Sequence, residues 1–237
     1  MSDPRDRLIV ALDVASAAAA RKIVAAVGES ASTYKVGMQL YTAEGPQVVR
    51  DLVSSGRRVF LDLKYHDIPN TVGAAVREAA ALQVSMLTVH AAGGGKMLRA
   101  AVEAARARPD LLVLAVTVLT SLDESDLAST GVNAGMDAQV LKLASLALGE
   151  GCQGIVSSAR EAPALRRKLG TNFALVTPGV RPAGGDVQDQ ARVVTPEEAI
   201  AAGASHVVVG RPITGAPDPA AAAAAILAQL ATATTYA

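Results

Sequence analysis

The sequence predicts a single (β/α)8 barrel, from its length, the spacing of its apolar runs and the helical patterns between those runs. The chain has 237 residues, close to the roughly 250 that one such barrel uses. Eight short apolar runs recur at fairly even intervals, which is typical of strands covered on both faces in a parallel sheet. Residues 1–237 are therefore expected to form one barrel domain, with a frayed tail over 231–237. A doubly wound open sheet is the lesser alternative.

The expected strands are short and rich in Val, Ile and Leu. They span residues 8–14, 33–38, 58–64, 86–90, 111–120, 154–159, 173–180 and 206–213. Helix-starting signals fall in the gaps between them. Ser16 and Asp218 are suitable N-caps, and Pro69 can open a helix at its first turn. Thr195 is followed by a proline and then by Glu198, which is the spacing of a capping box.

Composition and charge exclude several classes of function. The 22 basic residues are balanced by 22 acidic ones, and no block of Lys and Arg supplies the basic field that nucleic acid binding needs. No apolar stretch approaches the roughly 20 residues of a membrane span, and the N-terminus lacks the pattern of a signal peptide. The only cysteine, Cys152, is interpreted as a small buried residue rather than a nucleophile. We therefore expect a cytoplasmic protein with no membrane or nucleic acid partner.

The third expected strand carries the strongest chemical signal. Asp62 and Lys64 alternate with apolar neighbours, so both side chains point to the same face. Burying two charges against the surrounding helices would cost several kcal/mol each unless they were paired. Both are therefore expected to point inward at the C-terminal mouth, where barrel enzymes place their active sites. Asp67 follows in the loop. A structural Asp–Lys ion pair that closes the barrel is the alternative reading.

Other polar residues follow or lie in the remaining strands and belong at the same mouth. They are Asp13, Lys35, Thr120, Arg181, Gly210 and Arg211. Lys35 alone could belong to a surface alternation, and Asp13 could be a strand-end cap, but the joint placement of these residues favours a site.

A phosphate group is the ligand that the last two loops favour. Barrel enzymes often bind phosphate with the loops after strands seven and eight. Here those loops hold Arg181, the glycine-rich segment 181–194 that includes Gln190, and the pair Gly210-Arg211. Glycine lets the backbone approach closely, and Arg offers a planar fork to phosphate oxygens. A solvated loop charge is the alternative for Arg181.

Several known motifs are missing. Gly95-Lys96 is followed by Met97 rather than Ser or Thr, so this run is not a P-loop. The three histidines, His66, His90 and His206, lack the spacing of metal ligands, and no metal site is expected.

The run DLKYHDIPNTV, from Asp62 to Val72, closely resembles the signature of the orotidine 5′-phosphate decarboxylase family. Further segments resemble the family in the same order along nearly the whole chain. They are LIVALDV, YKVGMQL, LTVHAAGG, VTVLTS, TPGVRP, Gln190 before ARVVTP, and VVVGRPIT. The resemblance implies decarboxylation of orotidine 5′-monophosphate to uridine 5′-monophosphate and CO2, the last step of de novo UMP synthesis, without a metal or organic cofactor.

The resemblance also implies roles for individual residues. Lys64 would donate a proton to C6 of the pyrimidine as the carboxylate leaves. The charged network would consist of Lys35, Asp62, Lys64 and Asp67. The family pattern implies a homodimer in which Asp67 and Thr71 reach the partner subunit's site. Ribose hydroxyls would contact Asp13 and Lys35, and the pyrimidine would face Thr120 and Ser121. The phosphate would be bound by Arg181, Gln190, Gly210 and Arg211.

Two other functions stay open on sequence alone. One is a related sugar-phosphate decarboxylase, aldolase or epimerase that uses a divalent metal on the same barrel; the DIPNTV continuation argues against it. The other is a non-catalytic barrel that binds pyrimidine nucleotides, which would not need Lys64.

Overall fold

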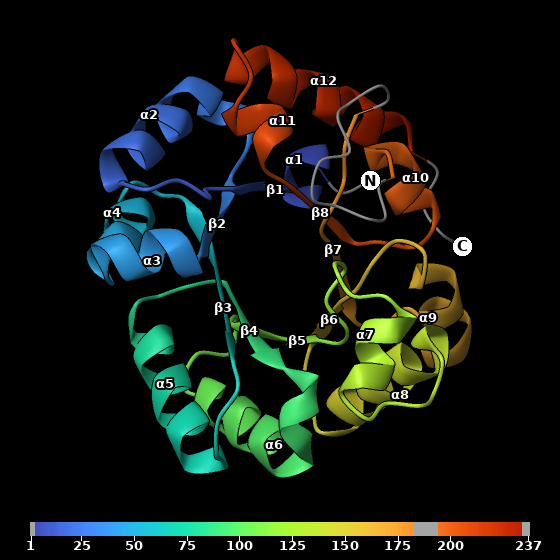
Figure 1. Ribbon diagram of the computed structural model, residues 1–237. Helices are drawn as coiled ribbons and strands as arrows, with labels where there is room; N and C mark the ends of the chain where they lie inside the picture. The colour runs from blue at the N-terminus through green and yellow to red at the C-terminus, as the bar shows by residue number, and fades with distance from the viewer. Residues whose placement is uncertain (1–2, 183–193, 234–237) are drawn as a thin grey trace.

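Eight parallel strands form a ring that closes in chain order, with helices around it (Figure 1). The computed structural model describes residues 3–182 and 194–233. β1 pairs with β2 on one side and with β8 on the other, so no strand edge is left open. The predicted (β/α)8 barrel is confirmed, and the open-sheet alternative is wrong.

The strands begin where the sequence predicts, or within one residue of it, but most end earlier. Their bounds are β1 Leu8–Ala11, β2 Thr33–Gly37, β3 Arg58–Tyr65, β4 Met86–His90, β5 Leu112–Val116, β6 Gly154–Val156, β7 Ala174–Thr177 and β8 His206–Val209. The apolar runs continue past the strand ends because the first loop residues are also buried. Leu12, Val180 and Ile213 are each 0 % exposed although none lies in a strand.

Helices cover the outside of the ring. Their bounds are α1 Pro4–Arg7, α2 Ala17–Val27, α3 Met38–Glu44, α4 Gln47–Ser54, α5 Pro69–Ala81, α6 Gly94–Ala105, α7 Glu124–Ser129, α8 Met136–Gly149, α9 Ala162–Leu169, α10 Pro196–Ala201, α11 Arg211–Thr214 and α12 Pro219–Thr232, with 3-10 turns η1 Gly28–Ser30 and η2 Ala91–Gly93. Two of these helices, α3 and α11, begin within or directly after segments expected to be strand. The last residues of α12 were expected to belong to a frayed tail; 234–237 lie outside the described residues.

The predicted caps form. The Ser16 hydroxyl accepts a hydrogen bond from the amide of Ala19, and the Asp218 carboxylate accepts one from the amide of Ala221. Thr195 and Glu198 form a reciprocal capping box. Within the described residues, no helix is both long and apolar enough to cross a membrane.

The core has two layers. Most of the buried apolar side chains lie between the strands and the helices. A smaller cluster fills the barrel interior and consists of Ile9, Ala11, Phe60, Met86, Leu114, Val176 and Val208. Cys152 is buried in the outer layer, and burial raises the pKa of its thiol to about 12. A thiol that stays protonated is a poor nucleophile, so the structural interpretation of Cys152 holds.

Candidate active site

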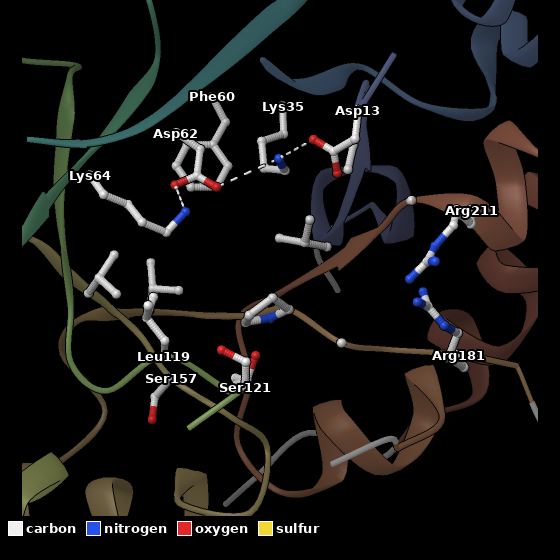
Figure 2. A pocket seen from close by; sticks show the side chains of 18 of the residues that line it. Asp13, Lys35, Phe60, Asp62, Lys64, Leu119, Ser121, Ser157, Arg181 and Arg211 are labelled. Carbon is white, nitrogen blue, oxygen red and sulfur yellow. Dashed lines mark hydrogen bonds and ion pairs between the residues drawn. The ribbon is translucent and has the colours of Figure 1, made fainter. Parts of the chain in front are cut away.

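A pocket of about 490 Å³ opens at the C-terminal mouth of the barrel, within the size range of small-molecule sites. Its floor is the top of the inner apolar cluster, including Phe60, and its walls come from the loops that follow the strands. Figure 2 shows two groups of charged side chains facing this pocket from different sides.

The first group is a row of alternating charges carried by β2, by β3 and by the segment that follows β1. The Lys35 ammonium lies 2.8 Å from Oδ1 of Asp13 and 3.6 Å from Oδ2 of Asp62. The Lys64 ammonium lies 2.9 Å from Oδ1 of Asp62. The Lys35 and Asp62 side chains are only 10 % and 13 % exposed. Solvent therefore screens the attraction between their charges less than it would at the surface. Asp13 lies two residues beyond the end of β1 rather than in the strand.

A bulge in β3 shapes this row. Leu61 pairs with Leu87 and Tyr65 pairs with Val89, so β3 advances four residues while β4 advances two. Lys64 lies inside the bulge with a φ of +51°, in the left-handed region. Such backbone in a non-glycine residue costs about 1 kcal/mol or more and is common at functional sites. Asp62 and Lys64 both line the pocket from this bulged segment.

The second group consists of Arg181, after β7, and Arg211, at the start of α11. Their guanidinium groups point toward each other in Figure 2. Burial, followed by the charge of Arg211, lowers the pKa of Arg181. Two guanidinium groups that point toward each other are suited to bind an anion between them. Gly179 and Gly210 lie beside them in the pocket wall.

The other residues singled out from the sequence fall in three places. Thr120 and Ser121 line the pocket, but they belong to the loop after β5, which ends at Val116. Asp67 and Thr71 are exposed and do not line this pocket. Gln190 lies outside the described residues.

The sequence interpretation missed the apolar wall of the pocket and one glycine. The wall includes Val116, Val118, Leu119, Val156, Pro178 and Val208, all of which the sequence assigns to expected strands rather than to the site. Gly37, at the end of β2, is needed because a Cβ there would lie 2.9 Å from the Lys35 ammonium and 3.0 Å from Asp13 Oδ1. Its position two residues after Lys35, on the same strand, was the available signal.

Two histidines lie beside the bulge. The rings of His66 and His90 stack with centroids 5.3 Å apart. Burial, and then the charges of His66 and Lys64, lower the pKa of His90. Among the described residues, no group of three or more His, Cys, Asp or Glu side chains could hold a metal ion.

Comparisons with known proteins identify the family to which this barrel and its pocket belong. The model of the family described as "Orotidine 5'-phosphate decarboxylase / HUMPS family" matches residues 6–226. The chain belongs to this family.

Relatives within the family are similar over nearly their full length. The orotidine 5′-phosphate decarboxylase of Moorella thermoacetica is 51 % identical over 233 residues, which cover 95 % of this chain and 92 % of that protein. The protein of the same name from Anaeromyxobacter sp. strain K is 53 % identical over 227 residues, covering 96 % and 99 %. The crystal structure of orotidine 5′-phosphate decarboxylase from Lactobacillus acidophilus superimposes with a TM-score of 0.83 at 38 % identity, covering 94 % and 98 %.

Proposed function

We propose that the pocket at the barrel mouth is the site at which this chain decarboxylates orotidine 5′-monophosphate to uridine 5′-monophosphate and CO2. The whole barrel acts as one catalytic domain. The observation that carries the assignment is the charged row Asp13–Lys35–Asp62–Lys64, largely buried at Lys35 and Asp62, opposite the two arginines, in a chain about half identical to relatives named for this reaction.

The charges of the pocket suit this substrate. The lining carries four basic side chains and two acidic ones, and the substrate carries a phosphate and a carboxylate. Arg181 and Arg211 bind the phosphate, together with Gly210 and with Gln190 from the segment outside the described residues. Asp13 and Lys35 bind the ribose hydroxyls. This seating directs the pyrimidine toward Lys64, with Thr120 and Ser121 along its edge.

Lys64 is the proton donor. Loss of CO2 from C6 leaves a carbanion in the plane of the ring, where the π system cannot delocalise the charge. Stabilisation must then come from charges already in place, and the Lys64 ammonium both attracts the carbanion and protonates it. Because Asp62 holds that ammonium at 2.9 Å, the proton is kept near the position where charge develops.

Asp62 also acts on the bound substrate. Its carboxylate repels the substrate carboxylate, and the repulsion disappears as CO2 leaves. At about 4 Å and an effective dielectric near 20, that repulsion is worth about 4 kcal/mol, or roughly three decades of rate. Enzymes commonly lower barriers by ~8–23 kcal/mol, so carbanion stabilisation and phosphate binding must supply the rest.

A homodimer with shared sites completes the network. Asp67 is exposed, and its Oδ1 accepts a hydrogen bond of 2.6 Å from the amide of Ile68. Its neighbour Ile68 is 65 % exposed, so an exposed apolar side chain adjoins a carboxylate that does not line its own pocket. Burying this surface against a second copy brings Asp67 and Thr71 to the partner's pocket.

The fall in absorbance as orotidine 5′-monophosphate is consumed tests the assignment. Pure protein is expected to turn the nucleotide over at the same rate with and without a chelator. Lys64→Ala is expected to lose at least about 1,000-fold in kcat while it still binds uridine 5′-monophosphate, because the variant lacks the proton donor but keeps the phosphate site. Activity abolished by chelator would favour the metal-dependent alternative. Binding without turnover in the unmodified protein would favour the non-catalytic one.

A further inference from the structure

We infer that Thr88, in the middle of β4, is a positioning residue that holds both Asp62 and Lys64 in their working geometry; this rests on the proposed function. Thr88 is 0 % exposed and does not line the pocket. It therefore acts on the reaction through the two charged residues rather than by touching the substrate.

The Thr88 hydroxyl makes two hydrogen bonds to the bulged segment of β3. Its oxygen accepts a bond of 2.8 Å from the backbone amide of Lys64. Its O–H donates to Oδ1 of Asp62 at 3.0 Å. The same Oδ1 accepts the Lys64 ammonium at 2.9 Å. One hydroxyl thus links the backbone of the proton donor to the carboxylate that holds its ammonium.

The bulge explains why this link is needed. Regular pairing between β3 and β4 is interrupted between Leu61 and Tyr65, and Lys64 adopts a left-handed φ of +51°. A backbone amide in such a segment needs an acceptor, because a buried unsatisfied amide costs about 1–3 kcal/mol. Thr88 supplies that acceptor at the point of strain. Its donated bond also fixes one oxygen of Asp62, which leaves Oδ2 facing Lys35.

Other buried threonines of the barrel differ from Thr88. Among the described residues, the hydroxyls of Thr33 in β2 and Thr177 in β7 are buried with no hydrogen-bond partner. Those two positions use threonine as a β-branched filler, whereas Thr88 uses both the donor and the acceptor of its hydroxyl. Replacing Thr33 by Val therefore serves as a control, because it removes a buried hydroxyl that makes no hydrogen bond.

The test compares steady-state kinetics of four proteins on orotidine 5′-monophosphate. Thr88→Val keeps the shape of the side chain and removes the hydroxyl. We expect its kcat to fall about 100-fold, the loss that a misplacement near 1 Å can cause, while KM changes less than about threefold because Thr88 is remote from the arginines. Thr88→Ser, which keeps the hydroxyl, is expected to stay within about fivefold of the unmodified kcat. Thr33→Val is expected to match the unmodified protein.

Each outcome decides one point. A wild-type kcat in Thr88→Val, an equal loss in Thr88→Ser, or the same loss in Thr33→Val would overturn the role of Thr88. If Thr88→Val does not fold, as judged by thermal melting, Thr88→Ala takes its place with the same expected loss of kcat. Failure of the unmodified protein to turn over the nucleotide would instead contradict the proposed function.

Discussion

Single residues set the positions of the charges in this pocket, and glycine is as important among them as the charged side chains. Lys35 and Asp13 pair at 2.8 Å beside Gly37, where a Cβ would lie 2.9 Å from the Lys35 ammonium and 3.0 Å from Asp13 Oδ1. The charged residues were predictable, since an Asp or a Lys at the end of an apolar strand is costly unless it is used or paired. Gly37 and Thr88 were not, because their roles depend on contacts between different strands.

Replacing Gly37 tests this dependence on space. Gly37→Ala places a methyl group 2.9 Å from the Lys35 ammonium, so the flexible end of Lys35 must move and the ion pair with Asp13 must lengthen. We expect kcat/KM to fall about 10- to 100-fold with little change in melting temperature. Gly149→Ala is the control, since a Cβ at Gly149 meets nothing within 4 Å. Equal kinetics in the two variants would contradict the role of Gly37.

At the scale of elements, strand starts and helix caps were predicted well because both depend on local sequence. Strand ends were predicted poorly, because the segments that follow the strands carry buried apolar residues, such as Val118 in a loop and Ile213 in α11. Hydropathy reports burial and does not distinguish a buried strand from a buried loop. The bulge in β3 was also missed, since regular alternation places Asp62 and Lys64 on one face without it.

The first residue of β8 makes stability depend on pH. His206 is partly buried, and its Nδ1 has no hydrogen-bond partner among the described residues. Burial, and then the charge of Arg58, lower the pKa of His206 to about 4. Below about pH 6.5 the imidazole of His206 is protonated in the unfolded chain but stays neutral in the folded chain until the pH approaches 4. The free energy of unfolding therefore falls as the pH drops from about 6.5 to 4, by about 2 kcal/mol after allowance for partial exposure.

Chemical denaturation at pH 7 and pH 4.5 checks this expectation. His206→Leu is expected to lose less stability between the two pH values than the unmodified protein, since it removes the group that titrates. An unchanged pH dependence in His206→Leu would show that other groups account for it.

At the scale of the whole molecule, closure of the barrel brings residues from opposite ends of the chain to one pocket. Asp13 follows β1 and Arg211 follows β8, and these strands are paired neighbours. The barrel could be predicted from the count and spacing of the strands. The proposed assembly of two copies rests on the family pattern, because the exposure of Asp67 and Ile68 is a property of the folded surface.

Mixing two inactive variants tests whether the sites are shared. Lys64→Ala lacks the proposed proton donor, and Asp67→Ala lacks the carboxylate that we propose reaches the partner's site. In a mixed dimer one site lacks both groups and the other is intact, so subunit exchange is expected to restore up to about one quarter of the unmodified activity. If Asp67 served its own subunit, each site would lack one group and mixing would restore nothing. A Lys64→Ala sample mixed with Asp62→Ala is the control, since these two residues share one pocket and cannot complement each other.

The bulge at Lys64 also limits how this chemistry can be moved to another scaffold. A designer who grafts Asp62 and Lys64 onto a regular strand would copy the residue types but not the backbone that aims them. The grafted segment must include the two additional residues of β3 relative to β4 and the left-handed backbone of Lys64. It must also include a hydroxyl on the neighbouring strand that accepts a hydrogen bond from the Lys64 amide. The transferable unit is therefore a pair of strands rather than a pair of side chains.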